Sequence, residues 1–598
     1  MSPIPRFRAT FAVLLAAVAH LWLQAGALAS KPGYSLADFR NYFPYDQESY
    51  LAIAINARNG SVAAVEPFTD TGSSYYPRLY YQVMGVLARI VGMDTVVMWT
   101  VLGLLVQVLL VLAIGATCVL LTRRWWTGVL GALPFVIGTF STITTGNWYA
   151  VLGSHGVLWG AYGVLFALNG ESASLCIAGI GLLALLLVGA GRIREQWRAP
   201  VAVLACAAVG ALANVQTYSF LTAVYLFAFV AAVFGLLRAG SRVLTLLSIA
   251  ALAAVLLAGS PVAQVLGPLP MLVLGLLPTL PGLWALVCRW RAPALSCVLA
   301  TVLTASPTVV ATAVGVAKRD PFLLFRESSP AGAHLGVPVA AGLAAGTVLL
   351  LTLLLVLVAG IHRRKPLWVA CSLGGGIGWA LIATNDRWGA NQEPYRLWID
   401  GFALVAIALV PLAALVATRY LGHRQPAEEK QAEEKPATVT LSRASRRWAA
   451  AGLAAVLLLA GASATDWWSF LRFTRDQGLL SYTSSQAMAL PAAISAGGPN
   501  SLVLPDPCIS PFVLKEQTGA RIAFYNLGLA WPDRETAMRK LLAARAAGVF
   551  DVDAARAAGV THVLTDSTCT QRWSGPGLQR ISAVGYGGGA ALLLLRLT

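Results

Sequence analysis

Two carboxylates stand close together at the start of a segment with helical periodicity. Asp46 and Glu48 follow Pro44, and Gly60 stands just past the far end of the segment. Apolar residues at 51, 54, 55 and 57 predict a helix that begins near the two acids. The acids could complement the positive end of the helix dipole, or they could act as a general base and metal ligands. The spacing alone leaves both interpretations open.

Basic residues in two later polar segments could bind a phosphate group. Lys318 and Arg319 stand together in one segment, and Arg387 and Arg396 stand in the other. A guanidinium binds phosphate through two parallel, charge-assisted hydrogen bonds. The alternative is that these residues anchor helix ends at the membrane interface beside tryptophan and tyrosine. Asp400 follows Arg396 by four residues, so the two could also pair on one helix face.

The composition places these candidates in a membrane protein. Of the 598 residues, 57% are hydrophobic and 12% are charged, against about 45–50% and about 25% in soluble domains. The mean hydropathy of +0.70 excludes a soluble enzyme, a disordered chain and a collagen-like fibre. The net charge of +17 comes from short basic clusters between apolar runs, which indicates positive-inside topology and not nucleic-acid binding. The chain has no P-loop and no zinc-ligand spacing, so nothing indicates an ATP-driven pump.

The apolar runs predict about thirteen transmembrane helices. They lie at 7–29, 96–122, 127–145, 172–191, 199–215, 219–237, 244–259, 262–288, 294–317, 336–361, 366–384, 397–418 and 448–465. This assignment places the basic clusters and the N-terminus in the cytoplasm and the C-terminus outside a plasma membrane. Residues 148–170 are also apolar enough to cross, and a crossing there would invert the later topology. We interpret them as a re-entrant or horizontal segment on the outer face.

The sequence divides into a membrane part, residues 1–465, and an extracytoplasmic part, residues 466–598. The membrane part contains a long first outer loop at 30–95 and a charged cytoplasmic linker at 419–447. In the outer part, strands near 501–504 and 561–564, a helix at 534–546 and a hairpin at 581–597 predict a small α/β domain. Cys508 and Cys569 each follow a predicted strand, so we expect a disulfide in this oxidising compartment; the alternative is two separate thiols.

The order of motifs in the first outer loop resembles that of the GT-C superfamily of membrane glycosyltransferases. In the branch that contains the protein O-mannosyltransferases and the lipid A aminoarabinose transferase, an acidic dipeptide opens a helix, and a Tyr-x-Lys-Pro-Pro-Leu-Tyr-Tyr stretch opens the next one. Here Asp46-Gln47-Glu48 stands in the place of the dipeptide. Tyr76-Pro77-Arg78-Leu79-Tyr80 replaces the second stretch. The sequence departs from the pattern in two ways, because Gln47 separates the acids and the second proline is missing.

The resemblance implies transfer of a pentose or hexose, as in an arabinosyl- or mannosyltransferase, from a polyprenyl-phosphate donor. The acceptor would be a glycan, lipid or protein of the cell envelope. Asp46 would be the general base, with Glu48 as its partner or as a ligand of a divalent cation. The donor phosphate would bind the basic residues, and further substrate contacts would come from other side chains of the outer face. The basic set is Lys318, Arg319, Arg387 and Arg396, and the substrate set is Tyr45, Tyr76, Arg78 and His155.

The sequence is also compatible with two other classes of function. A transporter or flippase would move a lipid-linked sugar without chemistry, and internal repeats would favour it. A polymerase or ligase of lipid-linked glycans would share the lipid donor with a transferase.

Overall fold

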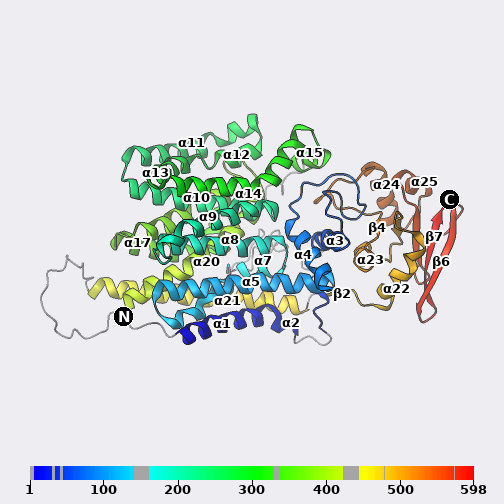
Figure 1. Ribbon diagram of the computed structural model, residues 1–598, viewed down its shortest axis with the longest axis horizontal. Coiled ribbons are helices and arrows are strands. Elements are labelled where there is room, and N and C mark those ends of the chain that lie inside the picture. The colour runs from blue at the N-terminus through cyan, green and yellow to red at the C-terminus, as the bar shows by residue number, and fades with distance from the viewer. Residues whose placement is uncertain are drawn as a thin grey trace.

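The computed structural model describes residues 6–29, 34–40, 45–140, 160–328, 336–421, 443–476, 479–570 and 573–598. A bundle of long helices makes up most of the molecule, and a small domain of helices and strands caps one end (Figure 1). The first described residues lie at the opposite end of the bundle.

The long helices of the bundle match most of the predicted membrane spans. Eleven helices are long and apolar enough to cross a membrane, and the bent pair α16–α17, whose parts meet at 73°, makes a twelfth. The bundle helices are α1 (Arg6–Leu21), α5 (Thr95–Thr122), α8 (Gly170–Gly189), α9 (Glu195–Ala211), α10 (Thr217–Ala239), α11 (Arg242–Leu266), α12 (Pro268–Leu274), α13 (Leu280–Trp290), α14 (Ala292–Ala317), α16 (Val339–Ala345), α17 (Thr347–His362), α18 (Pro366–Val369), α19 (Gly375–Ala383), α20 (Pro394–Leu421) and α21 (Arg443–Asp476).

The expected span at 127–145 differs from a long α-helix. The chain forms a 3₁₀-helix, η2 (Trp125–Val136), which is too short to count as a candidate span. A 3₁₀-helix rises about 2.0 Å per residue, so twelve residues still cover about 24 Å of the hydrocarbon core.

Residue 160, where the described chain resumes, leads into α7 (Ala161–Phe166). The carbonyl of Ala167 accepts a hydrogen bond from Gln47 in the outer loop, so the chain has passed from one end of the bundle to the other. Most of the 148–170 segment lies outside the described residues.

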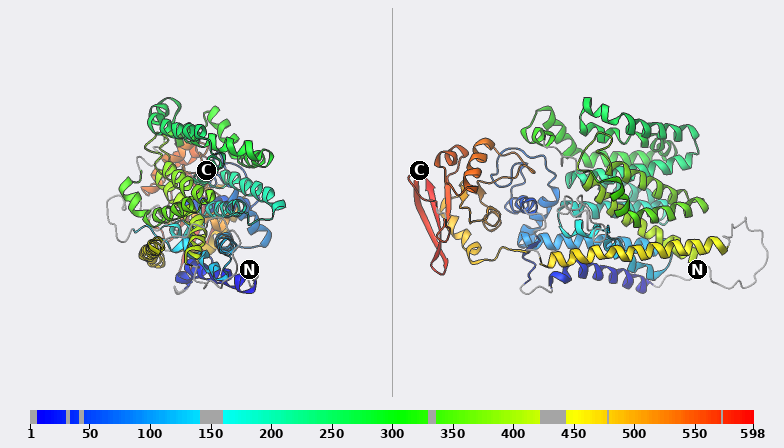
Figure 2. Two further views of the ribbon diagram at one scale, coloured as in Figure 1. Left: turned by 90° about the vertical axis from the view of Figure 1, so that its left-hand side faces the viewer. Right: turned by 180° about the vertical axis from the view of Figure 1, so that it is seen from behind.

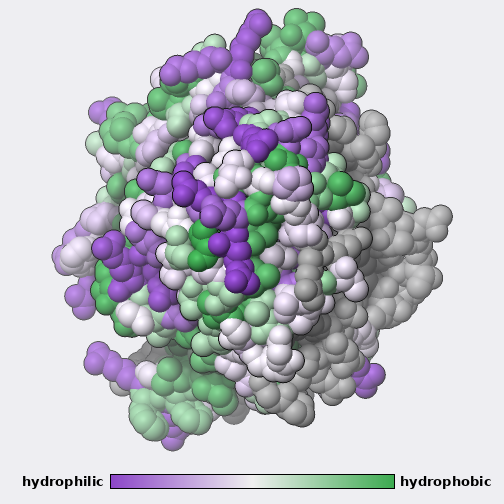
Figure 3. Space-filling view, turned by 90° about the vertical axis from the view of Figure 1, so that its right-hand side faces the viewer, coloured by the Kyte–Doolittle hydropathy of each residue, from purple (hydrophilic) through white to green (hydrophobic). Residues whose placement is uncertain are grey.

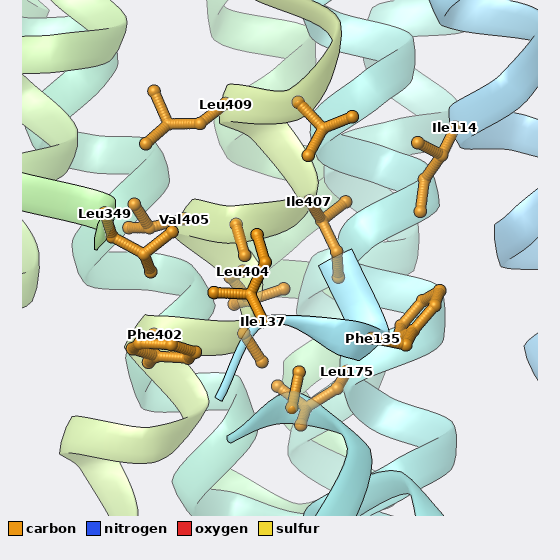
Figure 4. Packing of buried hydrophobic residues seen from close by; sticks show 14 of the residues in the cluster. Ile114, Phe135, Ile137, Leu175, Leu349, Phe402, Leu404, Val405, Ile407 and Leu409 are labelled. Carbon is orange, nitrogen blue, oxygen red and sulfur yellow. The ribbon is translucent and has the colours of Figure 1, made fainter. Parts of the chain in front are cut away.

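Helix α20 forms the centre of the bundle, and α14 lies at its edge. In the most apolar part of α20, 67% of the residues are buried, against 6% in α14. Figure 4 shows Leu404 and Ile407 of α20 beside Phe135 of η2 and Ile137, the residue that follows η2. In the end view of Figure 2, α11 and α14 lie on the outside of the bundle. The element that carries Arg396 is therefore the most firmly packed of the spans.

The first outer loop forms two helices joined by an irregular segment. Helix α3 (Asp46–Arg58) begins at the predicted acids, and α4 (Leu79–Val91) ends at Gly92, whose φ is 70°. The two helices touch at Gly85, where an added Cβ would lie 2.1 Å from the carbonyl oxygen of Ala54. Only glycine permits this approach, which fixes the two helices against each other.

The C-terminal domain contains a five-stranded sheet in the order β4-β3-β5-β7-β6. Strands β3 (Leu502–Pro505), β4 (Arg521–Ile522) and β5 (His562–Asp566) are parallel, whereas β6 (Leu578–Gly587) and β7 (Ala590–Leu597) form an antiparallel hairpin. Its helices are α22 (Ser485–Ile494), α23 (Pro511–Thr518), α24 (Glu535–Ala546) and α25 (Val552–Ala558). Cys508 and Cys569, which follow β3 and β5, form the expected disulfide. Figure 3 looks onto this end and shows many hydrophilic side chains on it.

The outer loop and the C-terminal domain share secondary structure. Strand β1 (Asp38–Arg40) pairs antiparallel with β2 (Leu479–Ser481), the first strand of the C-terminal domain. The amide of Ile522 donates to the carbonyl of Phe68, and the backbones of Ser73 and Trp531 exchange two hydrogen bonds. Helix α21 continues past residue 465 to Asp476, so the outer domain begins with β2.

Candidate active site

Asp46 begins helix α3 and is partly exposed to solvent. Its Oδ1 accepts a hydrogen bond of 3.3 Å from the side-chain amide of Asn526, a residue of the C-terminal domain. The same amide donates to Oγ of Ser49, one turn further along α3, over 3.1 Å. The preceding residue, Tyr45, has a φ of 68°, which a non-glycine residue rarely adopts. The acid is thus held in place from the side of the C-terminal domain.

Glu48 lies in a different environment from Asp46. Its side chain is buried, and its carboxylate accepts a hydrogen bond from the backbone amide of Tyr45 over 3.3 Å. Burial raises the pKa of the Glu48 carboxyl to about 7, and the hydrogen bond from the Tyr45 amide opposes this rise. Glu48 interacts electrostatically with Tyr482, whereas Asp46 interacts with Tyr50 and Tyr76. The structure therefore separates two acids that the sequence places two residues apart.

Tyrosine side chains connect Asp46 to the end of helix α20. The rings of Tyr50 and Tyr76 stack with centroids 5.2 Å apart, and their hydroxyl groups are hydrogen-bonded. Tyr81 stacks on the other side of Tyr50 at 5.1 Å. Both Tyr50 and Tyr76 interact electrostatically with Asp46 and with Arg396. The tyrosine pair therefore lies within electrostatic range of two residues that are 350 positions apart in the sequence.

Arg396 lies in a cluster of partly buried charged and aromatic groups. Its Nε forms an ion pair with Glu393 at 2.8 Å, and its guanidinium lies over the ring of Tyr218 at 5.6 Å. Arg326, at the end of α15 (Pro321–Ser328), approaches the same Glu393 at 3.9 Å. It also donates to the hydroxyl of Tyr218 over 3.3 Å. Two guanidinium groups from different elements therefore meet at one carboxylate.

Two further acids lie next to this cluster inside the bundle. Asp400, which could have paired with Arg396, accepts a hydrogen bond of 2.9 Å from Ser219 and shares another with Glu171. Arg396 interacts electrostatically with both carboxyl groups. The closest ion pair of Arg396 is the one with Glu393, three residues before it. Arg396 is therefore surrounded by acids on the inner side and by Tyr50 and Tyr76 on the side of α3.

The other predicted phosphate-binding residues lie further out. Lys318 and Arg319 are exposed at the end of α14. The next residue, Asp320, accepts a hydrogen bond of 3.0 Å from Ser73, so this corner contacts the outer loop. Arg387 is also exposed, and the residue before it, Asp386, lines a cavity of about 360 Å³ between α11 and the loop before α20. Within the described part of the chain, no contact joins the side chains of these three residues to helix α3.

The predicted substrate contacts have different surroundings. The ring of Tyr45 is 59% exposed and rests against Phe512 and Phe524 of the C-terminal domain. Tyr76 belongs to the tyrosine stack described above. Arg78 donates hydrogen bonds to the carbonyls of Ala63 and Val65, which holds the outer loop in its fold, and burial lowers its pKa to about 10. His155 lies outside the described residues.

Several residues that the structure brings to the site are not among those predicted from the sequence. Asn526, Glu171, Arg326 and Glu393 belong to this group. The position of Glu171 could have indicated its role, since an acid at the start of an apolar run is functional or paired by default. Asn526 carried none, because its contact with Asp46 depends on how the C-terminal domain docks on the outer loop.

No protein-family model matches the chain, and no curated protein matches it in sequence. Solved structures do match. The oligosaccharyltransferase AglB of Archaeoglobus fulgidus, in complex with an inhibitory peptide and a dolichol-phosphate, aligns over 94% of this chain and 70% of its own, with a TM-score of 0.51 and 11% identity. The same enzyme tethered to an acceptor peptide aligns over 95% and 70%, with a TM-score of 0.50 and 12% identity.

A third match is ArnT of Cupriavidus metallidurans bound to undecaprenyl phosphate, over 97% of each chain with 12% identity. Its TM-score of 0.47 is too low to support a structural argument. With sequence identities of 11–12%, the similarity of these structures to this chain shows a shared fold and not a shared activity. That fold is the GT-C membrane architecture expected from the sequence.

Proposed function

We propose that this chain, which has the GT-C fold, is a membrane glycosyltransferase that uses a polyprenyl-phosphate sugar donor. The observation that carries the proposal is the stacked, hydrogen-bonded pair of Tyr50 and Tyr76, which lies within electrostatic range of both Asp46 and Arg396. An acid and a phosphate-binding cation on two sides of one site are what such a transfer requires. The AglB structure with dolichol-phosphate and a peptide, which has the same fold, supports the proposal.

In the proposed reaction, Asp46 accepts the proton of the attacking acceptor hydroxyl. The hydroxyl oxygen bonds to the anomeric carbon of the sugar, and the bond from that carbon to the phosphate oxygen breaks. The lipid phosphate leaves with the electron pair of this bond, and the guanidinium groups of Arg396 and Arg326 stabilise its charge. The hydrogen bond from Asn526 holds the Asp46 carboxylate toward the acceptor.

The residues around Asp46 do not make a complete metal site. The one cluster of three possible ligands in the described chain is Asp506, Cys508 and Cys569, and its two cysteines are bonded to each other. Glu48 is buried with its carboxylate on the Tyr45 amide, and its raised pKa disfavours the ionised form that a cation needs. The proposed reaction therefore contains no step through a divalent cation.

We further propose that the transfer takes place on the outer face of the plasma membrane. Arg123, Arg192, Arg363 and Arg419 lie close enough to interact electrostatically. They gather at the helix ends that face away from the outer loop, and Arg192 donates to the carbonyl of Leu121 there. Such a basic face is typical of the cytoplasmic side. The C-terminal domain would then be extracytoplasmic, and the acceptor would be a glycan, lipid or protein of the cell envelope.

The test is transfer of a labelled pentose or hexose from a polyprenyl-phosphate donor by the purified protein in detergent. Asp46→Asn should lower the turnover by about 10²–10⁴-fold, since it removes the general base. The matched control is Glu535→Gln, which removes an acid that pairs with Arg539 in the C-terminal domain. Equal activity of wild type and Asp46→Asn would overturn the role of Asp46. No transfer by any variant, together with movement of intact lipid-linked sugar, would favour a flippase.

A further inference from the structure

The carboxylate of Glu393 occupies the place between the two guanidinium groups of the site. It lies 2.8 Å from Nε of Arg396 and 3.9 Å from Arg326, and its side chain is 12% exposed. The hydroxyl of Tyr395 also donates to it over 3.4 Å. Arg396 lies over the face of Tyr218, and Arg326 bonds the hydroxyl of the same residue. The carboxylate thus reduces the repulsion between two cations that the fold holds around one ring.

The carboxylate of Glu393 belongs to a strained loop between α19 and α20. Gly389, Asn391 and Glu393 have φ values of 96°, 41° and 37°. The loop is closed by Asn385, whose amide nitrogen donates to the carbonyl of Gln392 over 3.2 Å and whose Oδ1 accepts from the backbone amide of Gln392 over 2.5 Å. Two such departures from ordinary backbone geometry, at non-glycine residues two positions apart, persist only where the surrounding structure imposes them. The loop therefore holds Glu393 at the arginines at a cost in backbone energy.

Carboxylates and phosphates bind guanidinium groups through the same pattern of charge-assisted hydrogen bonds. We propose that Glu393 is a resident anion that occupies the phosphate position of the empty site and competes with the lipid phosphate for Arg396 and Arg326. This inference rests on the proposed function, in which these two residues bind the donor phosphate. Binding of the donor displaces the carboxylate from the guanidinium groups, and the strained loop takes up the movement.

Competition by Glu393 acts more strongly on the product than on the donor. The phosphate of a polyprenyl-phosphate sugar is a diester with one negative charge. After transfer, the lipid phosphate is a monoester, whose charge near neutral pH is about −1.5 to −2. The repulsion from Glu393 increases with that charge, so the returning carboxylate promotes release of the spent lipid. Glu393 would thus set the preference of the site for donor over product.

The test measures binding of labelled undecaprenyl phosphate to the purified full-length protein in detergent. Glu393→Gln removes the charge and keeps the size of the side chain, and we expect it to tighten binding roughly tenfold, with a lower kcat because the product stays bound. Glu393→Ala should tighten binding in the same way, which provides a second variant if the first fails to fold. Glu393→Asp keeps the anion and should bind like wild type. The control Glu535→Gln should leave binding unchanged.

The outcomes separate this inference from the proposed function. If wild type binds undecaprenyl phosphate and Arg396→Ala does not, the phosphate site is established, and the Glu393 variants then decide the inference. Unchanged or weaker binding by both Glu393→Gln and Glu393→Ala would overturn it and would make Glu393 a positioning residue for Arg396. Absence of binding by wild type would overturn the phosphate site itself.

Discussion

Asp46 and Glu48 show how two acids that stand two residues apart acquire different properties from their surroundings. Asp46 is partly exposed and faces the tyrosine stack, whereas Glu48 is buried against the backbone of Tyr45. Burial favours the neutral form of a carboxyl, which makes Glu48 the poorer base of the two. Asp46, which is hydrogen-bonded to Asn526 at the site, therefore remains the candidate base.

The pKa of Glu48 predicts a pH-dependent stability. An unfolded Glu titrates near 4.5, and burial raises the pKa of Glu48 to about 7 in the folded protein. The folded state then binds more protons between these values, so its stability falls as the pH rises from about 5 to about 8, by at most ~3 kcal/mol. Glu48→Gln lacks this titration. Its melting temperature relative to wild type should increase across this pH range, and an unchanged difference from pH 5 to pH 8 would contradict the prediction.

At the scale of elements, the contact between helices α3 and α4 determines the position of Asp46, which begins α3. An alanine Cβ at position 85 would lie 2.1 Å from the Ala54 carbonyl oxygen and 2.8 Å from the Arg58 backbone nitrogen, so the helices would have to separate. Gly85→Ala should destabilise the protein by about 1–3 kcal/mol and reduce transfer, since overpacking shifts the backbone. Thermal unfolding and the transfer assay measure both effects.

Gly376→Ala is the matched control for this prediction. Its added Cβ would meet only a Leu353 methyl group at 3.7 Å, which is an ordinary contact. This variant should keep wild-type stability and activity. If Gly85→Ala behaves like Gly376→Ala, the close approach at Gly85 does not position α3.

Several elements were predictable from the sequence, and others were not. Helix α4 and its end at Gly92 follow from apolar spacing and a glycine with positive φ, both of which are local signals. The 3₁₀ conformation of η2 was not predictable, because hydropathy reports the length of an apolar run and not its hydrogen-bonding pattern. The position of Arg396 beside Tyr50 and Tyr76 was not predictable from residue spacing either, since it depends on how α20 packs in the centre of the bundle.

At the scale of the whole molecule, the chain has two ends of different character. The outer loop, the candidate site and the disulfide lie at one end, and the basic clusters lie at the other (Figure 1). A C-terminal alkaline phosphatase fusion should therefore be active and a C-terminal fluorescent fusion dark. The opposite result would place the C-terminal domain in the cytoplasm and would require one more or one fewer crossing.

The disulfide provides a second prediction at this scale. It joins residues 61 positions apart and links the ends of the parallel strands β3 and β5. Closing a loop of this length contributes about 4 kcal/mol in the chain-entropy model, and often less in practice. Cys508→Ser should lower the unfolding temperature of the outer domain. Thiol labelling of the unreduced, denatured wild type should leave these two cysteines unlabelled, and reaction at both would exclude the bond.

The pairing of β1 with β2 joins residues that are more than 400 positions apart in the chain. During synthesis, the outer loop emerges early, but its partner strand and Asn526 emerge only after the last membrane helix. Native contacts of this sequence separation form late, because the intervening chain must be ordered first. Asp46, the proposed general base, therefore reaches its final position only after the segment around Asn526 has been synthesised. Under the proposed function, a chain truncated or stalled before that segment would insert into the membrane without transfer activity.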